Sequence, residues 1–398
     1  MARKERIGIL GGSFDPVHLG HIRMGLSVLN AGCLDRLFVM PTGDPPHKSC
    51  LAPAEDRWKM LVSACSCDKR LVPSRLELDR KGCIYTFDTL TELRKEYPKA
   101  HLYYVIGADT LMHLHTWYRF PEVLSLCTFL VCPRAGAPDS SILSVEINRL
   151  EALGGSFVTV PMELLTVSST EVRSALSSGM NPDNLDVSVL EYCQCKGLYG
   201  SPGRLDQVGP WLEQLFSALK PKRFAHSLSV AYTAKKLAKL HGLDPVKAEQ
   251  AGLLHDCAKC LPLQEMQRIA VENHLTDDRA FLDTASLLHS IVGAWVAENT
   301  YGMKDPDVLD AIRYHNTGSA GMSRLSVCIC LSDSIEPLRQ SYPHLEEVRS
   351  LAESSLERAL LLSLEETADY VVSRGLYLHP RTQDTIRWLK SLPENVNR

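Results

Sequence analysis

Apolar and polar positions follow two different patterns along the 398 residues of this chain. In roughly the first 200 residues, short continuous apolar runs alternate with longer segments in which apolar positions recur at a helical spacing. Such runs are typical of buried strands, and the longer segments of helices that cover a sheet. The predicted strands cover 6–10, 36–43, 102–109, 128–136 and 156–162, and the predicted helices cover 21–32, 54–65, 84–98 and 168–179. This alternation predicts an α/β fold with a doubly wound, mainly parallel sheet and helices on both faces.

The second half of the chain has a helical period almost throughout, as in residues 227–242, and convincing strand alternation disappears. A cluster of glycine, proline and serine at 200–203 separates the two patterns. We therefore expect an α/β domain over residues 1–200, a linker over 201–209 and an all-α domain over 210–398.

Composition narrows the classes of function. Apolar residues make up 45% of the chain and charged residues 23%, as in ordinary globular proteins. The net charge of −4 provides no bulk positive field, so we expect no nucleic-acid partner. No apolar run approaches the roughly 20 residues of a membrane span, so we expect a cytoplasmic protein that does not bind membranes. The thirteen scattered cysteines fit free thiols in a reducing compartment. These totals leave open whether the chain forms a homo-oligomer.

The stretch GGSFDPVHLGHI, residues 11–22, follows the first predicted strand and leads into a helix. Metal binding, proton transfer and phosphate binding are the three roles that two histidines could have at such a position. Gly11 and Gly12 let the backbone approach a ligand closely, and His18 and His21 can face one point at the start of the helix. The positive end of a helix disfavours a cation and favours an anion. Phosphate binding is therefore the best interpretation.

Two later loops offer further groups that bind phosphate. Residues 41–49 form a turn-rich loop with His47 and Lys48. Residues 167–173 are rich in hydroxyl groups and open another helix, which Ser169 can cap and which carries Arg173 in its first turns. Two helix N-termini at one sheet suit a polyphosphate better than a monophosphate.

With these groups in this order, the first half of the chain resembles a known family, the bacterial nicotinate-mononucleotide adenylyltransferases. The resemblance rests on seven segments in order: 11–22, PPHK (45–48), YTFDTL (85–90), IGADTLMHLHTWYRFPEVL (106–124), PRAG (133–136), SSTEVR (168–173) and YCQCKGLY (192–199). It implies a Rossmann-like nucleotidyltransferase that joins nicotinate mononucleotide to the AMP part of ATP and releases pyrophosphate. Mg²⁺ is expected to arrive with ATP, since no carboxylate cluster here forms a cage for it.

The resemblance also implies roles for individual residues. His18 and His21 would be catalytic, through the charge that develops on the α-phosphoryl group. The other implied contacts are Gly11, Gly12, Ser13 and Phe14 in the first loop, Ser168, Ser169, Thr170 and Arg173 at the outer phosphates, Gly107 and Asp109 at adenosine, Thr86, Trp117 and Tyr118 at the pyridine ring, and Lys48 and Arg134 at the mononucleotide phosphate. As isolated residues, Trp117 and Tyr118 would more often be core side chains. Phosphopantetheine and nicotinamide mononucleotide stay open as alternative acceptors.

In the second half, six polar residues interrupt helices that otherwise look buried. They are His226, His255, Asp256, His289, His315 and Asp333. Unpaired, they would be costly in a core, and collecting them around cations removes that cost. Six ligands are too many for one four-coordinate ion, so they suggest two metal ions with Asp256 as a bridge. Imidazoles with carboxylates suit iron, manganese or zinc. The alternative is a set of hydrogen-bonded core histidines.

This half resembles the HD-domain phosphohydrolases, most nearly their YqeK-type branch. The matching segments are HSLSVA, AGLLHDCAK, LHSIVGA, YHNTG, MSRLSVCICLSDSIEP and LERAL. The resemblance implies a di-iron centre that splits diadenosine tetraphosphate, a dinucleoside polyphosphate, symmetrically into two ADP. From its place one turn beyond His255, Lys259 is expected to face the phosphates as a catalytic residue. The branch commonly has threonine where this chain has Asn316, which affects substrate choice rather than the metal site. A sensor that binds metal and nucleotide without turnover, or a hydrolase of another nucleotide, stays open as the alternative.

Overall fold

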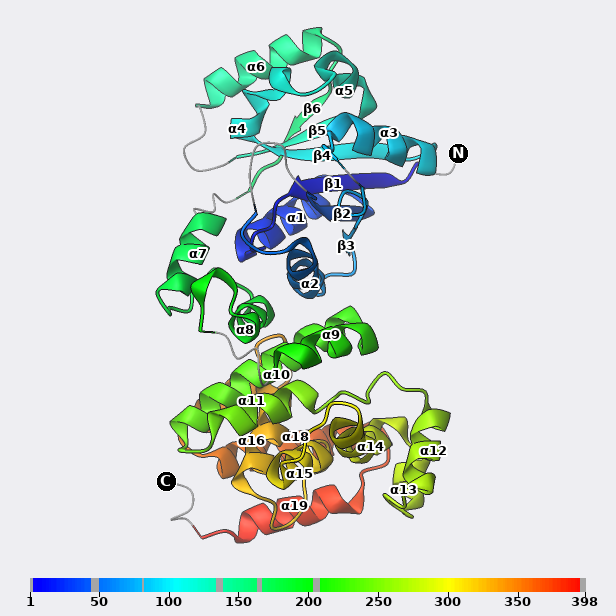
Figure 1. Ribbon diagram of the computed structural model, residues 1–398, viewed down its shortest axis with the longest axis vertical. Coiled ribbons are helices and arrows are strands. Elements are labelled where there is room, and N and C mark those ends of the chain that lie inside the picture. The colour runs from blue at the N-terminus through cyan, green and yellow to red at the C-terminus, as the bar shows by residue number, and fades with distance from the viewer. Residues whose placement is uncertain are drawn as a thin grey trace. The chain divides into compact units, whose positions relative to one another are not determined.

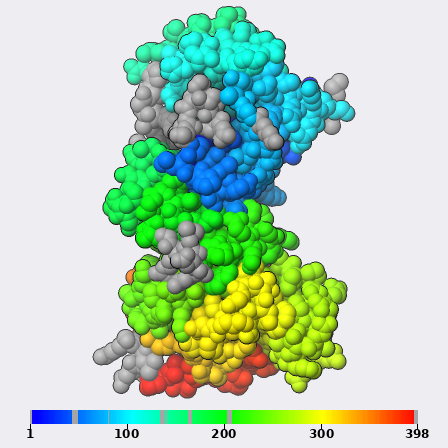
Figure 2. Space-filling view, in the orientation of Figure 1, coloured from blue at the N-terminus to red at the C-terminus, as the bar shows by residue number. Residues whose placement is uncertain are grey.

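The computed structural model describes residues 3–43, 50–80, 82–133, 139–162, 167–202 and 208–393. The chain divides into two compact units, Met1–Gly203 and Arg204–Arg398. Each unit is one continuous stretch of chain, so blue to green atoms make up the first unit and green to red atoms the second (Figure 2).

The first unit is built on a six-stranded parallel sheet with strand order β3-β2-β1-β4-β5-β6 (Figure 1). Its strands are β1 (Arg6–Gly12), β2 (Arg36–Pro41), β3 (Leu71–Pro73), β4 (His101–Gly107), β5 (Thr128–Cys132) and β6 (Phe157–Thr159). The chain builds outward from β1 to β3, then returns to the other side of β1 with β4. Open α/β sheets bind their ligands outside the carboxyl ends of the strands at such a reversal, which here lies between β1 and β4.

Helices cover both faces of the sheet because alternate strand residues point to opposite sides. Ile7 and Ile9 of β1 belong to a buried cluster that includes residues of α3, α4, α5 and α6. Leu10 of β1 and Leu37 of β2 point to the other face, where they lie close to Gly25 of α1. The doubly wound α/β prediction is confirmed.

The helices of the first unit are mostly where the periodicity predicts them. They are α1 (Leu19–Ala31), α2 (Ala54–Cys65), α3 (Thr86–Glu96), α4 (Ala108–Leu111), α5 (Phe120–Leu126), α6 (Ser140–Ala152), α7 (Ser169–Ser177) and α8 (Val187–Lys196), with 3-10 turns η1 (Leu114–Thr116) and η2 (Leu198–Gly200). The sequence prediction missed β3, α4, α5, α6 and α8. Ser168 caps α7 through its side chain, so the assignment of that cap to Ser169 was wrong.

The second unit consists of helices throughout its described residues, 208–393, which confirms the all-α prediction. They are α9 (Gly209–Ala218), α10 (Pro221–Leu240), α11 (Pro245–Leu254), α12 (Leu263–Glu272), α13 (Arg279–Leu282), α14 (Ala285–Asn299), α15 (Pro306–Tyr314), α16 (Arg324–Ile335), α17 (Leu345–Ala352), α18 (Leu356–Ser373) and α19 (Pro380–Ser391). In the part of the chain that the structure describes, no helix combines the length and apolar character needed to cross a membrane.

Candidate active sites

The end of β1 and the loop that follows it are closely packed, and neighbouring side chains leave little room for a side chain at Gly11 or Gly12. A Cβ atom on Gly11 would lie 2.9 Å from the hydroxyl oxygen of Tyr104, closer than real Cβ contacts come. A Cβ atom on Gly12 would lie 3.2 Å from the ring of Phe14, which is buried and has a positive φ of 45°. The backbone therefore runs where side chains would not fit, at the carboxyl end of the central strand.

His18 and His21 stack at the start of α1, with ring centroids 3.7 Å apart. His18 is the N-cap residue, and the backbone N–H of His18 donates a hydrogen bond to Nδ1 of His21 over 3.2 Å. A neutral His21 therefore carries its ring proton on Nε2, which leaves that atom as a donor. The pair supplies imidazoles beside the positive end of a helix, as the phosphate interpretation requires.

The N-terminal turn of α7 lies against the same loop. The hydroxyl of Ser169 donates to the carbonyl of Pro16 over 3.1 Å, and Nη1 of Arg173 donates to the carbonyl of Asp15 over 2.7 Å. Nη2 of Arg173 bonds the hydroxyl of Thr170 over 3.2 Å, while Ser168 pairs with Glu171 in a capping box. The structure thus brings residues 168–173 together with the β1–α1 loop, 150 residues earlier in the chain.

The residues expected at a pyridine ring form two neighbouring aromatic groups. The hydroxyl oxygens of Thr86 and Tyr104 lie 3.4 Å apart, and the ring of Trp117 packs edge-on against Tyr104 at 5.8 Å. Trp117 also packs against the core of the sheet. Tyr118 is half exposed and lies 4.5 Å from the ring of Tyr85. Trp117 and Tyr118, with their neighbours Tyr104 and Tyr85, form a group of rings that we call the aromatic wall.

The remaining predicted contacts are placed only in part. Gly107 ends β4, and its backbone lies so close to Asp109 that an added Cβ would clash with the carboxylate. This puts Asp109 at the carboxyl edge of the sheet, next to β1. Lys48 and Arg134, expected at the mononucleotide phosphate, lie outside the described residues.

Sequence reasoning missed a buried arginine that organises this site. Arg57 of α2 is buried, and its guanidinium donates to the carbonyls of Ser13 at 2.7 Å, Thr42 at 2.9 Å and Gly43 at 3.1 Å. It therefore ties the loop after β1 to the loop after β2. An arginine among apolar residues of a predicted helix was the signal available in the sequence, because a buried guanidinium needs several acceptors.

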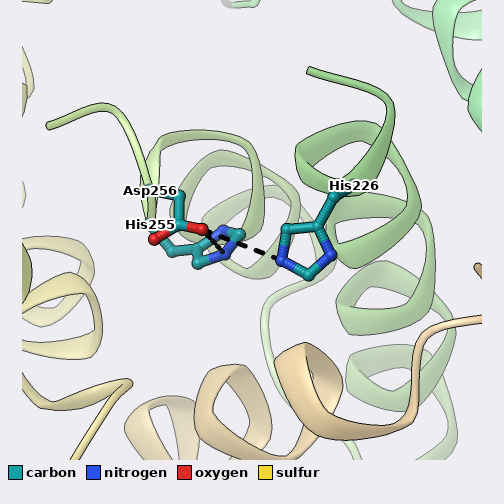
Figure 3. A group of neighbouring side chains, drawn as sticks. All are labelled: His226, His255 and Asp256. Carbon is teal, nitrogen blue, oxygen red and sulfur yellow. Dashed lines mark ion pairs between the residues drawn. The ribbon is translucent and has the colours of Figure 1, made fainter. Parts of the chain in front are cut away.

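The second unit gathers all six predicted metal ligands in one place. They come from five segments: α10, the ends of α11 and α15, the middle of α14, and α16. Figure 3 shows three of them, with the carboxylate of Asp256 facing the rings of His226 and His255. Three overlapping sets of side chains have ligand atoms within 4.8 Å of one another: His226, His255 and Asp256; His255, His315 and Asp333; and Asp256, His289 and His315.

The carboxylate of Asp256 stands between two groups of imidazoles. Its Oδ2 lies 3.4 Å from Nε2 of His255 and 3.8 Å from Nε2 of His226. Its Oδ1 lies 3.2 Å from Nε2 of His289 and 3.7 Å from Nε2 of His315. Asp333 completes the first group, since its Oδ1 is 2.9 Å from Nε2 of His226. A carboxylate with one oxygen toward each group can bridge two cations.

Hydrogen bonds on the far side of three rings orient them toward this centre. Nδ1 of His255 lies 2.7 Å from the carbonyl of Gly252, and Nδ1 of His315 lies 2.7 Å from the carbonyl of Ile312. Because a carbonyl only accepts, Nδ1 carries the proton, and Nε2 of each neutral ring presents its lone pair to the centre. Nδ1 of His226 is held in the same way by Glu336, at 3.0 Å.

Protonation states follow from burial and from the two carboxylates. Burial lowers the pKa of His255 and lowers that of His289 to about 4, which favours the neutral form of imidazole that can bind a cation. Burial opposes the charge of Asp256, but the surrounding imidazoles outweigh it and hold the pKa of that carboxyl well below its usual range. Burial also opposes the charge of Asp333, but its hydrogen bond with His226 outweighs burial and holds the pKa of that carboxyl well below its usual range. In turn, Asp333 and Glu336 overcome burial and raise the pKa of His226 to about 9.

These residues fit divalent cations. Among the described residues, four buried atoms of the cluster lack a hydrogen bond of good geometry: Nε2 of His226, Nε2 of His255, Oδ1 of Asp256 and Oδ1 of Asp333. Nε2 of His226 and Nε2 of His255 both lie within 4 Å of Oδ1 of Asp333, and Oδ1 of Asp256 faces Nε2 of His289 and of His315. Leaving such atoms unsatisfied is costly, and cations among them would satisfy all four.

Other charged groups line the centre. Nζ of Lys259 lies 3.0 Å from Nε2 of His289 and 3.8 Å from Oδ1 of Asp256, which places it beside the predicted ligands. Sequence reasoning missed Arg223, Glu336 and Arg339, which contact Asp256, His226 and Asp333. Spacing could have found two of them, because Arg223 precedes His226 and Glu336 follows Asp333 by one helical turn.

Comparisons with known proteins agree with this division. A family model described as cytidylyltransferase-like matches residues 9–175, and the HD domain model matches residues 223–338. A Mycoplasma genitalium protein named "Probable nicotinate-nucleotide adenylyltransferase/Ap4A hydrolase" is 28% identical over 376 residues, which are 92% of this chain and 99% of that protein. A Corynebacterium kroppenstedtii protein named "Probable nicotinate-nucleotide adenylyltransferase" is 35% identical over 213 residues, which are 52% of this chain and 96% of that protein.

A crystal structure from Clostridium acetobutylicum, described as a predicted HD superfamily hydrolase involved in NAD metabolism, also resembles the chain. It is 36% identical, with a TM-score of 0.45, and the match covers 46% of this chain and 96% of that one. The two family models occupy separate units, and the Corynebacterium protein is matched over nearly its whole length. The chain therefore belongs to the nicotinate-nucleotide adenylyltransferase family and carries an HD domain in its second half.

Proposed function

We propose that the chain is a bifunctional enzyme with one activity in each domain, 1–200 and 210–398, joined by residues 201–209. The first transfers AMP from ATP to nicotinate mononucleotide, giving nicotinate adenine dinucleotide and pyrophosphate. The second hydrolyses diadenosine tetraphosphate to two ADP. The Mycoplasma relative, whose name joins both activities and which matches 92% of this chain, supports the pairing.

For the first activity, the juxtaposition of the β1–α1 loop with the start of α7 carries the proposal. A phosphate oxygen of the mononucleotide attacks the α-phosphorus of ATP, and the bond to the bridging oxygen breaks as pyrophosphate leaves. The nucleophile is already an anion, so no general base is needed and positioning dominates. His18 and His21 would stabilise charge on the α-phosphoryl group, and Ser169 and Arg173 would hold the outer phosphates, which arrive with Mg²⁺.

The aromatic wall supports a pyridine-containing acceptor. Trp117 and Tyr118 offer flat faces for a ring, and the hydroxyl of Thr86 lies beside them. Phosphopantetheine would offer no ring to this wall. Incubation of the chain with ATP and each candidate acceptor, with pyrophosphate detection, tests this half. Nicotinate mononucleotide should give the highest kcat/KM, and a preference for phosphopantetheine would refute the assignment.

For the second activity, the bridging position of Asp256 between two imidazole groups carries the proposal. His226, His255, His289, His315, Asp256 and Asp333 would hold two divalent cations, which we propose to be iron. When bound, such ions activate water and neutralise phosphate oxygens. Lys259 would contact the phosphate chain and offset its charge. Water adds to one inner phosphorus, the inner anhydride bond breaks, and both halves leave as ADP.

The pattern of products tests this half. The chain is purified without oxygen, its metal content is measured, and it is incubated with diadenosine tetraphosphate. ADP as the sole nucleotide product would support symmetrical cleavage. Equal amounts of AMP and ATP would show cleavage at an outer bond, and would refute the proposed position of the phosphate chain.

A further inference from the structure

Three cationic side chains from separate segments surround the candidate metal centre. Arg223 lies in the first turn of α10, Lys259 in the turn after α11, and Arg339 after α16. Nη1 of Arg223 lies 2.5 Å from Oδ2 of Asp256, and Nζ of Lys259 lies 3.8 Å from Oδ1 of the same carboxylate. Nη1 of Arg339 lies 3.6 Å from Oδ1 of Asp333. All three cations thus approach the carboxylates of the centre.

These cations are the exposed part of the cluster. The side chains of His255, His289, His315 and Asp256 are at most 2% exposed. Those of Arg223, Lys259 and Arg339 are 32%, 28% and 43% exposed, and Asp333 is 22% exposed. The more exposed groups of the cluster, which a ligand from solvent can contact, therefore carry three positive charges and one negative charge.

The two arginines also have donors to spare. A guanidinium has five N–H donors, and among the described residues the one hydrogen bond that Arg223 makes uses Nη1. Arg339 approaches Asp333 over a longer distance, with its side chain largely open to solvent. Forked donors of this kind match the oxygens of phosphate groups, and one arginine can hold two oxygens at once.

We propose that Arg223, Lys259 and Arg339 form a polyphosphate-binding entrance, which holds the phosphates flanking the scissile anhydride. This inference rests on the proposed hydrolase function and deepens it, since it names what selects the substrate. A chain of three or four phosphates can reach the buried carboxylates and imidazoles and still contact the exposed cations. An isolated phosphodiester offers only two unesterified oxygens, too few to pair with the centre and with all three cations at once. The entrance therefore selects polyphosphates over single diesters.

The first test measures binding and needs no turnover. Calorimetric titration of the full chain with sodium tripolyphosphate compares the native protein with R339M, R339K and R387M. Arg387 is an exposed arginine of α19 that pairs with Asp384, so R387M is the matched control. Tripolyphosphate that binds in the first unit contributes the same binding heat in all four proteins. The adenylyltransferase rate of each protein shows that the first unit is intact. We expect R339M to weaken one site about tenfold, R339K to restore part of the affinity, and R387M to match the native protein.

A second test measures selectivity. The ratio of kcat/KM for diadenosine tetraphosphate to kcat/KM for bis(p-nitrophenyl) phosphate should fall at least about tenfold in R339M, and further when R223M is added. Native affinity for tripolyphosphate in R339M, or equal losses on both substrates, would overturn the entrance. A native chain that cleaves no dinucleoside polyphosphate would refute the proposed function, while the tripolyphosphate titration would still decide whether the entrance binds phosphate chains.

Discussion

Oε1 of Glu336 lies 3.0 Å from Nδ1 of His226, on the side of the ring that faces away from the metal-ligand cluster. Both groups are buried, and Oε2 of the same carboxylate accepts the backbone N–H of Leu338 at 2.6 Å. The carboxylate thus receives two N–H groups and fixes how the imidazole presents Nε2. Carboxylates in this position commonly orient metal-ligating histidines and strengthen them as ligands.

Replacement of Glu336 by glutamine should therefore weaken metal binding without unfolding the domain. The two N–H groups use different oxygens of the carboxylate, and glutamine replaces one of these oxygens with an NH2 group, which donates and cannot accept. We expect metal affinity to fall about 10- to 100-fold, measured by competition with a chelator. The control is E357Q, another buried glutamate, which pairs with Arg324. Unchanged affinity in E336Q would show that this carboxylate has no role in metal binding.

Metal ions should also stabilise the second unit selectively. Six polar side chains converge there, five of them buried, and a bound cation stabilises only the folded arrangement. At a hundredfold excess over Kd, one ion should add about 2.7 kcal/mol to the free energy of unfolding. Scanning calorimetry of chelated and reloaded protein should show a higher Tm for one transition on reloading. The same shift in His255→Ala would mean that the ion binds elsewhere.

Arg57 should be essential to both stability and activity of the first unit. R57M leaves the carbonyls of Ser13, Thr42 and Gly43 without their donor, so we expect a loss of about 3 kcal/mol in the free energy of unfolding and impaired ATP binding. Denaturant unfolding and adenylyltransferase kinetics measure the two effects. R75M removes an arginine whose ion pairs with Glu55 and Asp79 are exposed, and should cost at most about 1 kcal/mol. Similar losses in both variants would contradict this role for Arg57.

Loss of activity on substitution of Gly11 by alanine should be compensated when Tyr104 is replaced by phenylalanine. A methyl group at Gly11 would meet the Tyr104 hydroxyl at 2.9 Å, and with that oxygen removed its nearest ring atom would be at 3.8 Å. G11A should therefore reduce adenylyltransferase kcat/KM by about tenfold or more, and the double variant G11A/Y104F should regain most of it. A double variant no better than the product of the two single effects would show that the residues do not interact in this way.

Much of this arrangement is predictable from the sequence, because burial leaves a plain pattern. Polar residues that interrupt apolar helices predicted the six side chains that the structure brings together in the second unit, and a glycine-rich turn before a helix predicted the loop that meets the start of α7. The three-residue strand β3 was missed, since so short a segment shows no period. Ser168 and Ser169 are both competent helix caps, and only the backbone conformation distinguishes them.

Supporting residues were harder to predict than ligands. Arg223 follows Lys220 and Lys222 in the sequence and looks like one of several solvated cations, although it contacts Asp256. Glu336 stands before a proline at a helix end, where a glutamate would usually face solvent. Long-range contacts decide such roles, and no local spacing reports that Arg57 of α2 reaches the loops after two different strands.

The central claim is that one chain carries two independent catalytic sites, and a crossed comparison of His18→Ala and His255→Ala tests it most directly. Each variant is assayed for formation of nicotinate adenine dinucleotide and for release of ADP from diadenosine tetraphosphate. We predict that His18→Ala loses the first activity by about a hundredfold or more and keeps the second, while His255→Ala shows the reverse. Loss of both activities in either folded variant, or loss of neither, would contradict the claim.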